Sequence, residues 1–114
     1  MEKFFEAKEG KVHYSDQGRG QVIVLLHGYL ETSEVWSSVA HQLSKKFRII
    51  AVDLPGHGKS DCNREVLSME IMATIIKKLL ESLSIKKFLL TGHSLGGYIT
   101  LAFAELFPEL LSGY

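Results

Sequence analysis

The sequence predicts an α/β fold in which helices cover both faces of a mostly parallel sheet. Residues 22–26 are apolar at every position, as expected of a strand that is covered on both of its faces. Further apolar runs alternate with helical periodicities along the rest of the chain. That alternation is typical of successive strand–helix units joined by right-handed crossovers. We expect residues 1–114 to belong to one such domain.

A β-hairpin is predicted ahead of the parallel strands. Residues 3–8 and 11–15 form two short strands around Glu9 and Gly10, where glycine can adopt the positive φ of a tight turn. The turn-rich residues 16–20 then lead into the strand at 22–26.

Two amphipathic helices follow. The first is predicted over about 32–45, because its apolar residues share one helical face. These residues are Val35, Trp36, Val39, Ala40 and Leu43. A buried strand at 49–52 and a breaker-rich loop come next, and the second helix begins after Ser68, which can cap it. Its apolar stripe runs through three turns and comprises Ile71, Met72, Ile75, Ile76, Leu79, Leu80 and Leu83.

A third strand and helix complete the pattern. Residues 88–90 form a third buried strand, and residues 95–107 form a helix that ends before Pro108. This helix is apolar on nearly all faces. We therefore expect it to lie in the middle of a domain.

Charge and composition exclude several classes of function. Thirteen Lys and Arg residues balance thirteen Asp and Glu residues without a long run of either sign, which argues against nucleic-acid and membrane-surface binding and favours a small-molecule or protein partner. No window approaches the ~20 apolar residues of a membrane span. Cys62 is the single cysteine and the start of the chain lacks a signal-peptide pattern, so we expect a cytoplasmic location.

The strongest chemical signal is Gly92-His93-Ser94-Leu95-Gly96, between an apolar strand and an apolar helix. In a G-x-S-x-G turn the serine sits on strained backbone, and the residues two positions away must be small. The turn exposes the Ser94 hydroxyl at a helix N-terminus, where free N–H groups stabilise an oxyanion. The alternative is a tight structural connection without catalysis, since so short a pattern also occurs by chance.

Two further segments point the same way. Residues 25–30, Leu-Leu-His-Gly-Tyr-Leu, follow the first buried strand. Residues 53–60, which read D-x-x-G-x-G-x-S, follow the second. We interpret His27 as a histidine that fixes the first loop, and Asp53 and Ser60 as hydrogen-bonding residues of the second, rather than as catalytic groups.

Together the three segments resemble the α/β-hydrolase superfamily, near its carboxylesterase-like and C–C-hydrolase-like members. The resemblance spans essentially the whole chain and implies the N-terminal portion of the α/β-hydrolase fold. It implies that Ser94 is the nucleophile and that the Tyr29 and Leu95 backbone N–H groups form the oxyanion hole. The residues expected to support the elbow and loop are Gly28, Gly92, His93 and Gly96. Epoxide hydrolases and haloalkane dehalogenases carry aspartate at the elbow, so the serine favours an ester, thioester or related acyl substrate.

The sequence departs from this family after Ser94. In the family the triad acid and then the histidine follow the nucleophile, but only Glu105, Glu109 and no histidine follow it here. Both glutamates lie on or at the end of the helix that leaves the elbow, and neither suits the triad. Of the five histidines, His27 alone is expected near the site. We therefore expect this chain to be a fragment that is inactive by itself.

The end of the chain motivates a second hypothesis. Residues 110–114 resemble the loop that enters the family's next strand, so the strand at 88–90 would be left as a sheet edge that can pair with another chain. The alternative function is a non-catalytic truncated product or interaction module that associates through this edge. Nucleotide and metal sites are disfavoured because neither G-x-G-x-x-G nor a cluster with ligand spacing occurs. We expect no cofactor.

Overall fold

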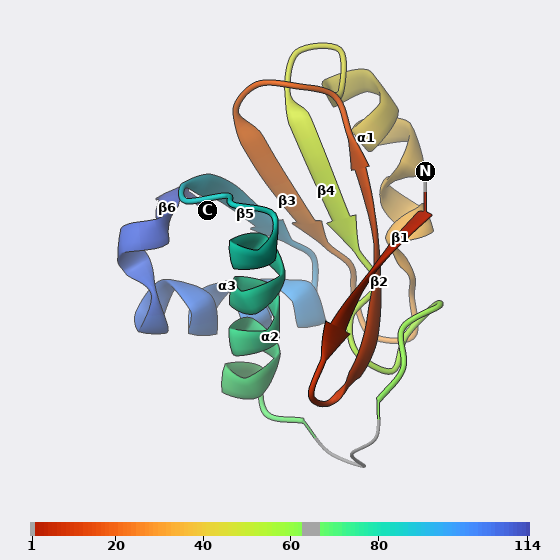
Figure 1. Cartoon of the computed structure of the whole chain (residues 1–114), viewed down its shortest axis with the longest axis vertical. Helices are drawn as coiled ribbons and strands as arrows, with labels where there is room; N and C mark the ends of the chain where they lie inside the picture. Colours follow the sequence, from red (N-terminus) through yellow and green to blue (C-terminus); the bar gives the residue numbers. More distant parts are fainter. Residues whose placement is uncertain (1, 63–66) are drawn as a thin grey trace.

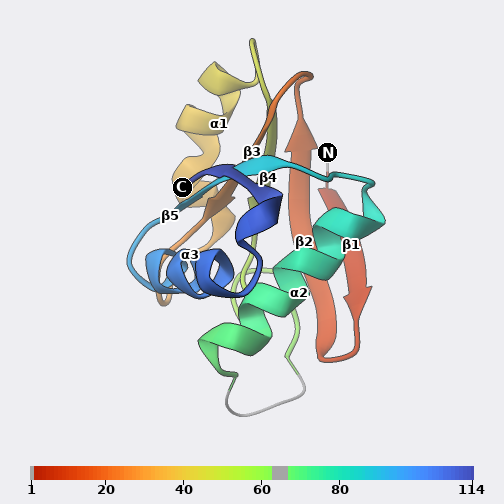
Figure 2. The same cartoon turned by 90° about the vertical axis from the view of Figure 1, so that its left-hand side faces the viewer.

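The computed structural model describes residues 2–62 and 67–114 and confirms the predicted α/β fold. Six strands form a mixed sheet in the order β1-β2-β4-β3-β5-β6, with helices on both faces (Figures 1 and 2). The strands are β1 (Glu2–Ala7), β2 (Gly10–Gln17), β3 (Val22–Leu26), β4 (Arg48–Val52), β5 (Phe88–Gly92) and β6 (Leu111–Gly113). The helices are η1 (Ser33–Trp36), α1 (Ser37–Leu43), α2 (Met69–Ser82), α3 (Leu95–Leu106) and η2 (Pro108–Leu110).

Strand register places three loops next to one another. Strand β3 pairs in parallel with both β4 and β5, and its last residue, Leu26, lies opposite Val52 on one side and Gly92 on the other. The loops that follow these strands therefore leave the sheet at the same edge. The predicted hairpin is also present: β1 and β2 are antiparallel, and β2 continues the sheet beside β4.

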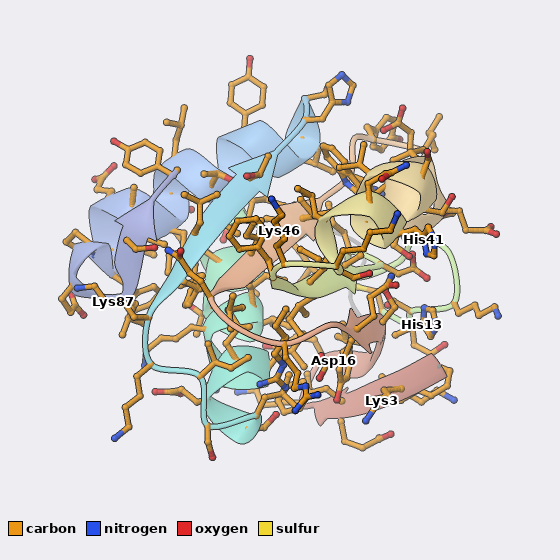
Figure 3. All side chains as sticks on the ribbon, turned by 90° about the horizontal axis from the view of Figure 1, so that it is seen from above. Lys3, His13, Asp16, His41, Lys46 and Lys87 are labelled. Carbon is orange, nitrogen blue, oxygen red and sulfur yellow. The ribbon has the colours of Figure 1, made fainter. Side chains whose placement is uncertain are left out.

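The two faces of β3 bury different apolar clusters. Leu25 packs with Ala40 of α1 and with Ile49 and Ala51 of β4. Val24 and Leu26 instead join the larger cluster beneath α2 and α3. Seen from above, α1 and α2 lie on opposite sides of the sheet (Figure 3). This arrangement explains the uninterrupted apolar run at 22–26, because neither face of β3 meets solvent.

Caps define the beginnings of the first two helical segments. The segment predicted at 32–45 forms as the short 3-10 turn η1 followed by α1, and the Thr32 hydroxyl accepts a hydrogen bond from the Glu34 N–H at 3.2 Å. The predicted Ser68 cap on α2 is present, with its Oγ accepting from the Ile71 N–H at 3.1 Å. Within the described residues no helix has the length and apolarity needed to cross a bilayer.

Helix α3 is less buried than its sequence predicts. Ile99 and Phe103 are fully buried, but Tyr98 is 66% exposed and Leu101 is 58% exposed. The helix covers the sheet with one side, and these two residues lie on the other. Along that side an open groove of about 480 Å³ runs from Ser94 to the chain end. The expectation of a helix surrounded by protein is therefore wrong for this chain.

The expected loop at the chain end is instead a short strand. Residues 111–113 form β6, which pairs in parallel with β5 through Phe88 opposite Leu111 and Leu89 opposite Gly113. The start of β5 is therefore not a free edge. Lys87 extends the contact, because its ammonium donates to the Glu109 carbonyl at 3.0 Å.

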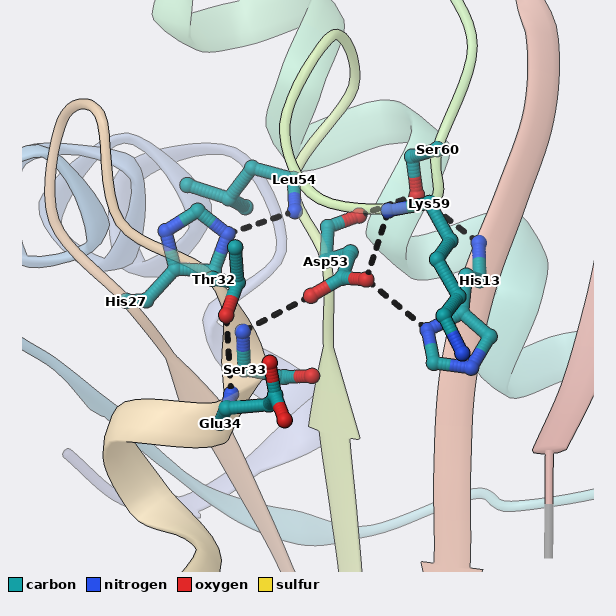
Figure 4. A network of polar contacts seen from close by, with 9 residues as sticks. All are labelled: His13, His27, Thr32, Ser33, Glu34, Asp53, Leu54, Lys59 and Ser60. Carbon is teal, nitrogen blue, oxygen red and sulfur yellow. Dashed lines mark hydrogen bonds and ion pairs between the residues drawn. The ribbon is translucent and has the colours of Figure 1, made fainter.

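A buried carboxylate ties β2, β4 and the loop before α1 together (Figure 4). Asp53 is 3% exposed and follows β4. Its Oδ1 accepts the Ser33 N–H at 2.7 Å, and its Oδ2 accepts the Lys59 N–H at 3.0 Å and faces His13 Nδ1 at 2.8 Å. The Ser60 hydroxyl donates to the Asp53 carbonyl at 2.6 Å and accepts the His13 N–H at 2.8 Å.

This environment lowers the pKa of Asp53. Burial alone raises the pKa of a carboxyl, but the hydrogen bonds from Lys59, Ser33 and His13 favour the ionised form and outweigh it. Gly58, at φ 53°, packs directly against the Asp53 carboxylate, and a Cβ at this position would collide with it. The predicted structural role of Asp53 and Ser60 agrees with these contacts.

Gly96 sets the distance between α3 and β3. A Cβ on Gly96 would collide with the Leu26 carbonyl oxygen and lie 2.7 Å from the His27 carbonyl oxygen. Because both contacts are with backbone, neither neighbour can move aside cheaply. A Cβ on the adjacent Gly97 would come no closer than 3.6 Å to any atom beyond its chain neighbours and the nearby backbone of its own helix. The first position therefore requires glycine for packing, and the second does not.

We expect Gly96→Ala to lower the free energy of unfolding by about 1–3 kcal/mol through overpacking. The matched control Gly97→Ala replaces glycine inside the same helix without a clash, and should raise stability by about 0.5–1 kcal/mol. Urea denaturation followed by circular dichroism measures both. Equal effects from the two substitutions would contradict the proposed packing constraint.

The Asp53→Asn substitution should cost about 2 kcal/mol at pH 7, because an amide cannot accept all of these hydrogen bonds. A carboxyl with a lowered folded-state pKa stabilises the protein above its unfolded pKa of about 4, and this contribution is lost as the pH falls through the folded value. The difference between wild type and variant should therefore shrink below about pH 4. Glu105→Gln, at an exposed carboxylate, serves as control. If wild type remained more stable than Asp53→Asn by the same amount at low pH, the ionised Asp53 carboxylate could not be the source of the difference.

Candidate active site

Ser94 occupies the strained junction between β5 and α3. It is exposed and precedes the first residue of α3, with φ 57° and ψ −113°. Positive φ in a residue with a side chain costs about 1–3 kcal/mol and persists only where surrounding contacts enforce it. Its hydroxyl does not cap the helix. The side chain that the sequence singled out is thus both strained and available.

Short backbone contacts hold this turn. The His93 N–H donates to the Leu26 carbonyl at 3.1 Å, and the Gly96 N–H donates to the His27 carbonyl at 3.0 Å. Within the turn, a Cβ on Gly92 would collide with the Gly96 carbonyl. Both glycines of the G-x-S-x-G pattern are therefore needed for backbone packing, as the sequence analysis expected.

His27 fixes the loop that follows β3. Its side chain is fully buried, and Nε2 accepts the Leu54 N–H at 2.9 Å (Figure 4). That acceptor role places the proton on Nδ1, which donates to the Gly28 carbonyl at 2.7 Å. Burial lowers the pKa of His27, and the Gly28 carbonyl opposes this only in part. Both ring nitrogens are engaged, which leaves neither to take a proton from Ser94.

The next residues form a tight turn against the elbow. The Glu31 N–H donates to the Gly28 carbonyl at 3.2 Å, and Leu30 adopts φ 61°. Gly28 is buried, and a Cβ there would lie 3.2 Å from both Ser94 Cβ and His93 Nδ1. A side chain at position 28 would therefore separate this loop from the nucleophile.

Two backbone N–H groups remain at the junction of the loops. In the part of the chain that the structure describes, neither the Tyr29 N–H nor the Leu95 N–H has an acceptor. Leu95 is the first residue of α3, where the helix provides no partner for the N–H group. Tyr29 directly follows Gly28, which faces Ser94. These are the donors that the resemblance implied.

No described residue is hydrogen-bonded to Ser94 as a base would be. Among residues 2–62 and 67–114, no histidine hydrogen-bonds the Ser94 hydroxyl. His57 packs against His27 and against the Tyr29 ring at 5.9 Å. Glu105 and Glu109 are exposed on α3 and η2, and no set of three potential metal ligands gathers in the described residues.

The sequence analysis missed one residue beside the site and one contact of another. His93, expected to support the elbow, lies with its Nδ1 3.6 Å from Glu31 Oε1. Glu31 was not identified, although its Oε1 accepts the Gly28 N–H at 2.8 Å. Glu31 lies three residues after Gly28, which is the spacing of a capping box, where a glutamate accepts the backbone N–H three residues before it. This spacing in the sequence could have identified Glu31.

Comparison with known proteins identifies the family. Residues 21–114 match the model of the alpha/beta hydrolase fold. A Mycobacterium tuberculosis protein of unknown function is 40% identical over 82% of this chain's length. A pimeloyl-(acyl-carrier protein) methyl ester esterase from Nitrosomonas europaea is 37% identical over 86% of the chain. Mouse epoxide hydrolase 4 is 36% identical over 89% of the chain. The chain spans only 28%, 37% and 29% of these relatives, respectively.

Solved structures agree with this result. A thermophilic esterase from Thermogutta terrifontis superposes with a TM-score of 0.90 at 29% identity, over 97% of this chain and 43% of that one. Family model, relatives and structure therefore coincide over the same residues that form the elbow and its neighbouring loops. This chain belongs to the alpha/beta hydrolase family.

Proposed function

We propose that Ser94 is the nucleophile of a serine hydrolase that acts on an ester, thioester or related acyl substrate. The observation that carries this proposal is the strained, exposed Ser94 beside two backbone N–H groups, those of Tyr29 and Leu95, that have no acceptor in the described part of the chain. Such a pair of donors suits the negative oxygen of a tetrahedral intermediate. Hydrolases among the relatives support the reaction class.

The chemistry proceeds through an acyl-enzyme. The Ser94 hydroxyl attacks the substrate carbonyl carbon while a base takes its proton, and the carbonyl oxygen gains negative charge between the two N–H groups. Collapse of this intermediate expels the leaving group, which takes up the proton. Water then attacks the Ser94 ester by the same route and releases the acid. The acid and the base belong, in this proposal, to residues beyond Tyr114.

The identity of the nucleophile favours acyl transfer over epoxide opening. A carboxylate that opens an epoxide forms an ester, which water can cleave at the enzyme's own carbonyl carbon. A serine hydroxyl would form an ether, and no carbonyl would be available for release. Similarity to mouse epoxide hydrolase 4 therefore supports the fold and a hydrolase, while Ser94 selects the acyl substrate.

A second candidate is a non-catalytic short product that binds a partner through the sheet edge. The small share of each relative that the chain spans keeps this alternative open. Pairing between β5 and β6 weakens it, because β6 covers the Phe88 end of the apolar strand.

We expect the protein isolated from its source to have about twice the 12.8 kDa of this chain or more, because the triad needs further residues. Intact mass spectrometry measures this directly. A native mass of 12.8 kDa would favour the second candidate.

In the native-length protein, Ser94→Ala should lower the rate of p-nitrophenyl ester hydrolysis by at least about 1,000-fold and abolish labelling by a fluorophosphonate probe. Ser112 is an exposed serine in β6, and the control Ser112→Ala should leave the hydrolysis rate and the labelling unchanged. Labelling that persists in Ser94→Ala would show that the nucleophile lies elsewhere.

A further inference from the structure

We infer that Glu31 is a positioning residue, which aligns the Tyr29 N–H for the oxyanion by holding the neighbouring Gly28 N–H. The inference rests on the proposed function, since it needs Ser94 to be the nucleophile. Glu31 acts through backbone and does not touch the reacting atoms. Its contacts, rather than its charge alone, carry the argument.

The Glu31 carboxylate determines which N–H group of the loop is left for substrate. Oε1 accepts the Gly28 N–H at 2.8 Å, so that group is engaged within the loop. The following N–H, that of Tyr29, has no acceptor in the described residues. The Tyr29 N–H and the Gly28 carbonyl belong to one rigid peptide plane, and the Glu31 N–H and His27 Nδ1 hold that plane at the carbonyl. The carboxylate holds the preceding plane through the Gly28 N–H, which restricts the rotation about Gly28 that would turn the Tyr29 N–H away.

The same residue closes the turn from both ends. The Glu31 backbone N–H donates to the Gly28 carbonyl at 3.2 Å, while its side chain accepts from the Gly28 N–H. Between them lies Leu30, held at φ 61°, a conformation that a leucine leaves readily unless it is restrained. His27 Nδ1 adds a third bond, at 2.7 Å, to the same carbonyl. Without the carboxylate, the Gly28 N–H would have no hydrogen-bond acceptor among residues 2–62 and 67–114.

The carboxylate also lies against the elbow. Its Oε1 is 3.6 Å from His93 Nδ1, and a Cβ on Gly28 would lie 2.8 Å from Glu31 Oε1 and 3.2 Å from Ser94 Cβ. Glu31, Gly28 and the residue before the nucleophile thus form one contact. His93 is 66% exposed, so solvent screens any electrostatic interaction between it and the carboxylate, and we assign the effect to the hydrogen bond with Gly28.

Variants of Glu31 in the native-length protein test this inference. Glu31→Gln keeps an oxygen at the same reach and should rescue kcat to within about threefold of wild type. Glu31→Asp keeps the charge but shortens the side chain, and Glu31→Ala removes the acceptor. Both should lower kcat by about 100-fold, with KM changed far less, because a small displacement of a positioned group costs that much. The fluorophosphonate labelling rate of Ser94 should fall in parallel.

Controls separate positioning from general stability and from the proposed function. Glu34→Ala changes an exposed carboxylate nearby and should retain wild-type kinetics. Melting temperatures should stay within a few degrees across the series. A wild-type kcat in Glu31→Ala, or a loss in Glu31→Gln equal to that in Glu31→Ala, would overturn the inference. Activity that survives Ser94→Ala would instead overturn the proposed function, so the two failures are distinguishable.

Discussion

The close contact between the start of α3 and the end of β3 is the constraint on which the rest of the site depends. Gly96 lies against the carbonyl groups of Leu26 and His27 and donates its N–H to the latter. This approach brings the helix N-terminus to the sheet edge and forces Ser94 into positive φ. The strain is local, but the buried apolar clusters on both faces of the sheet supply the stability that maintains it.

Around that contact, buried polar groups fix the neighbouring loops without taking part in the proposed chemistry. His27 joins the loop after β3 to Leu54, and Asp53 joins the loop after β4 to Ser33 and His13. Each group has hydrogen-bond partners suited to one protonation state: His27 is neutral and Asp53 is ionised. The two residues thus resemble catalytic groups in type, but their bonds are directed into the scaffold.

For the proposed function, the described residues provide the oxyanion side of a serine site, but not its base. Strain, helix N-terminus and backbone donors are all local to two adjacent strand ends, those of β3 and β5. A base for the serine is not among the described residues near it. Within the proposed function, the oxyanion side of the site is complete here, and proton transfer depends on residues elsewhere. Family membership agrees with this division, because the chain covers less than half of each relative reported above.

The sequence by itself determined the strand–helix order, the Ser68 cap and the elbow at Ser94, because periodicity, capping and glycine spacing are local properties. It did not predict β6, since only pairing with Phe88 and Leu89 makes a strand of residues 111–113. It overestimated the burial of α3, because an apolar helix does not reveal which of its sides meets the sheet. Only the tertiary structure decided that Gly28 and Glu31 lie beside His93 and Ser94, because register and the glycine-permitted approach of α3 bring these two separate loops together.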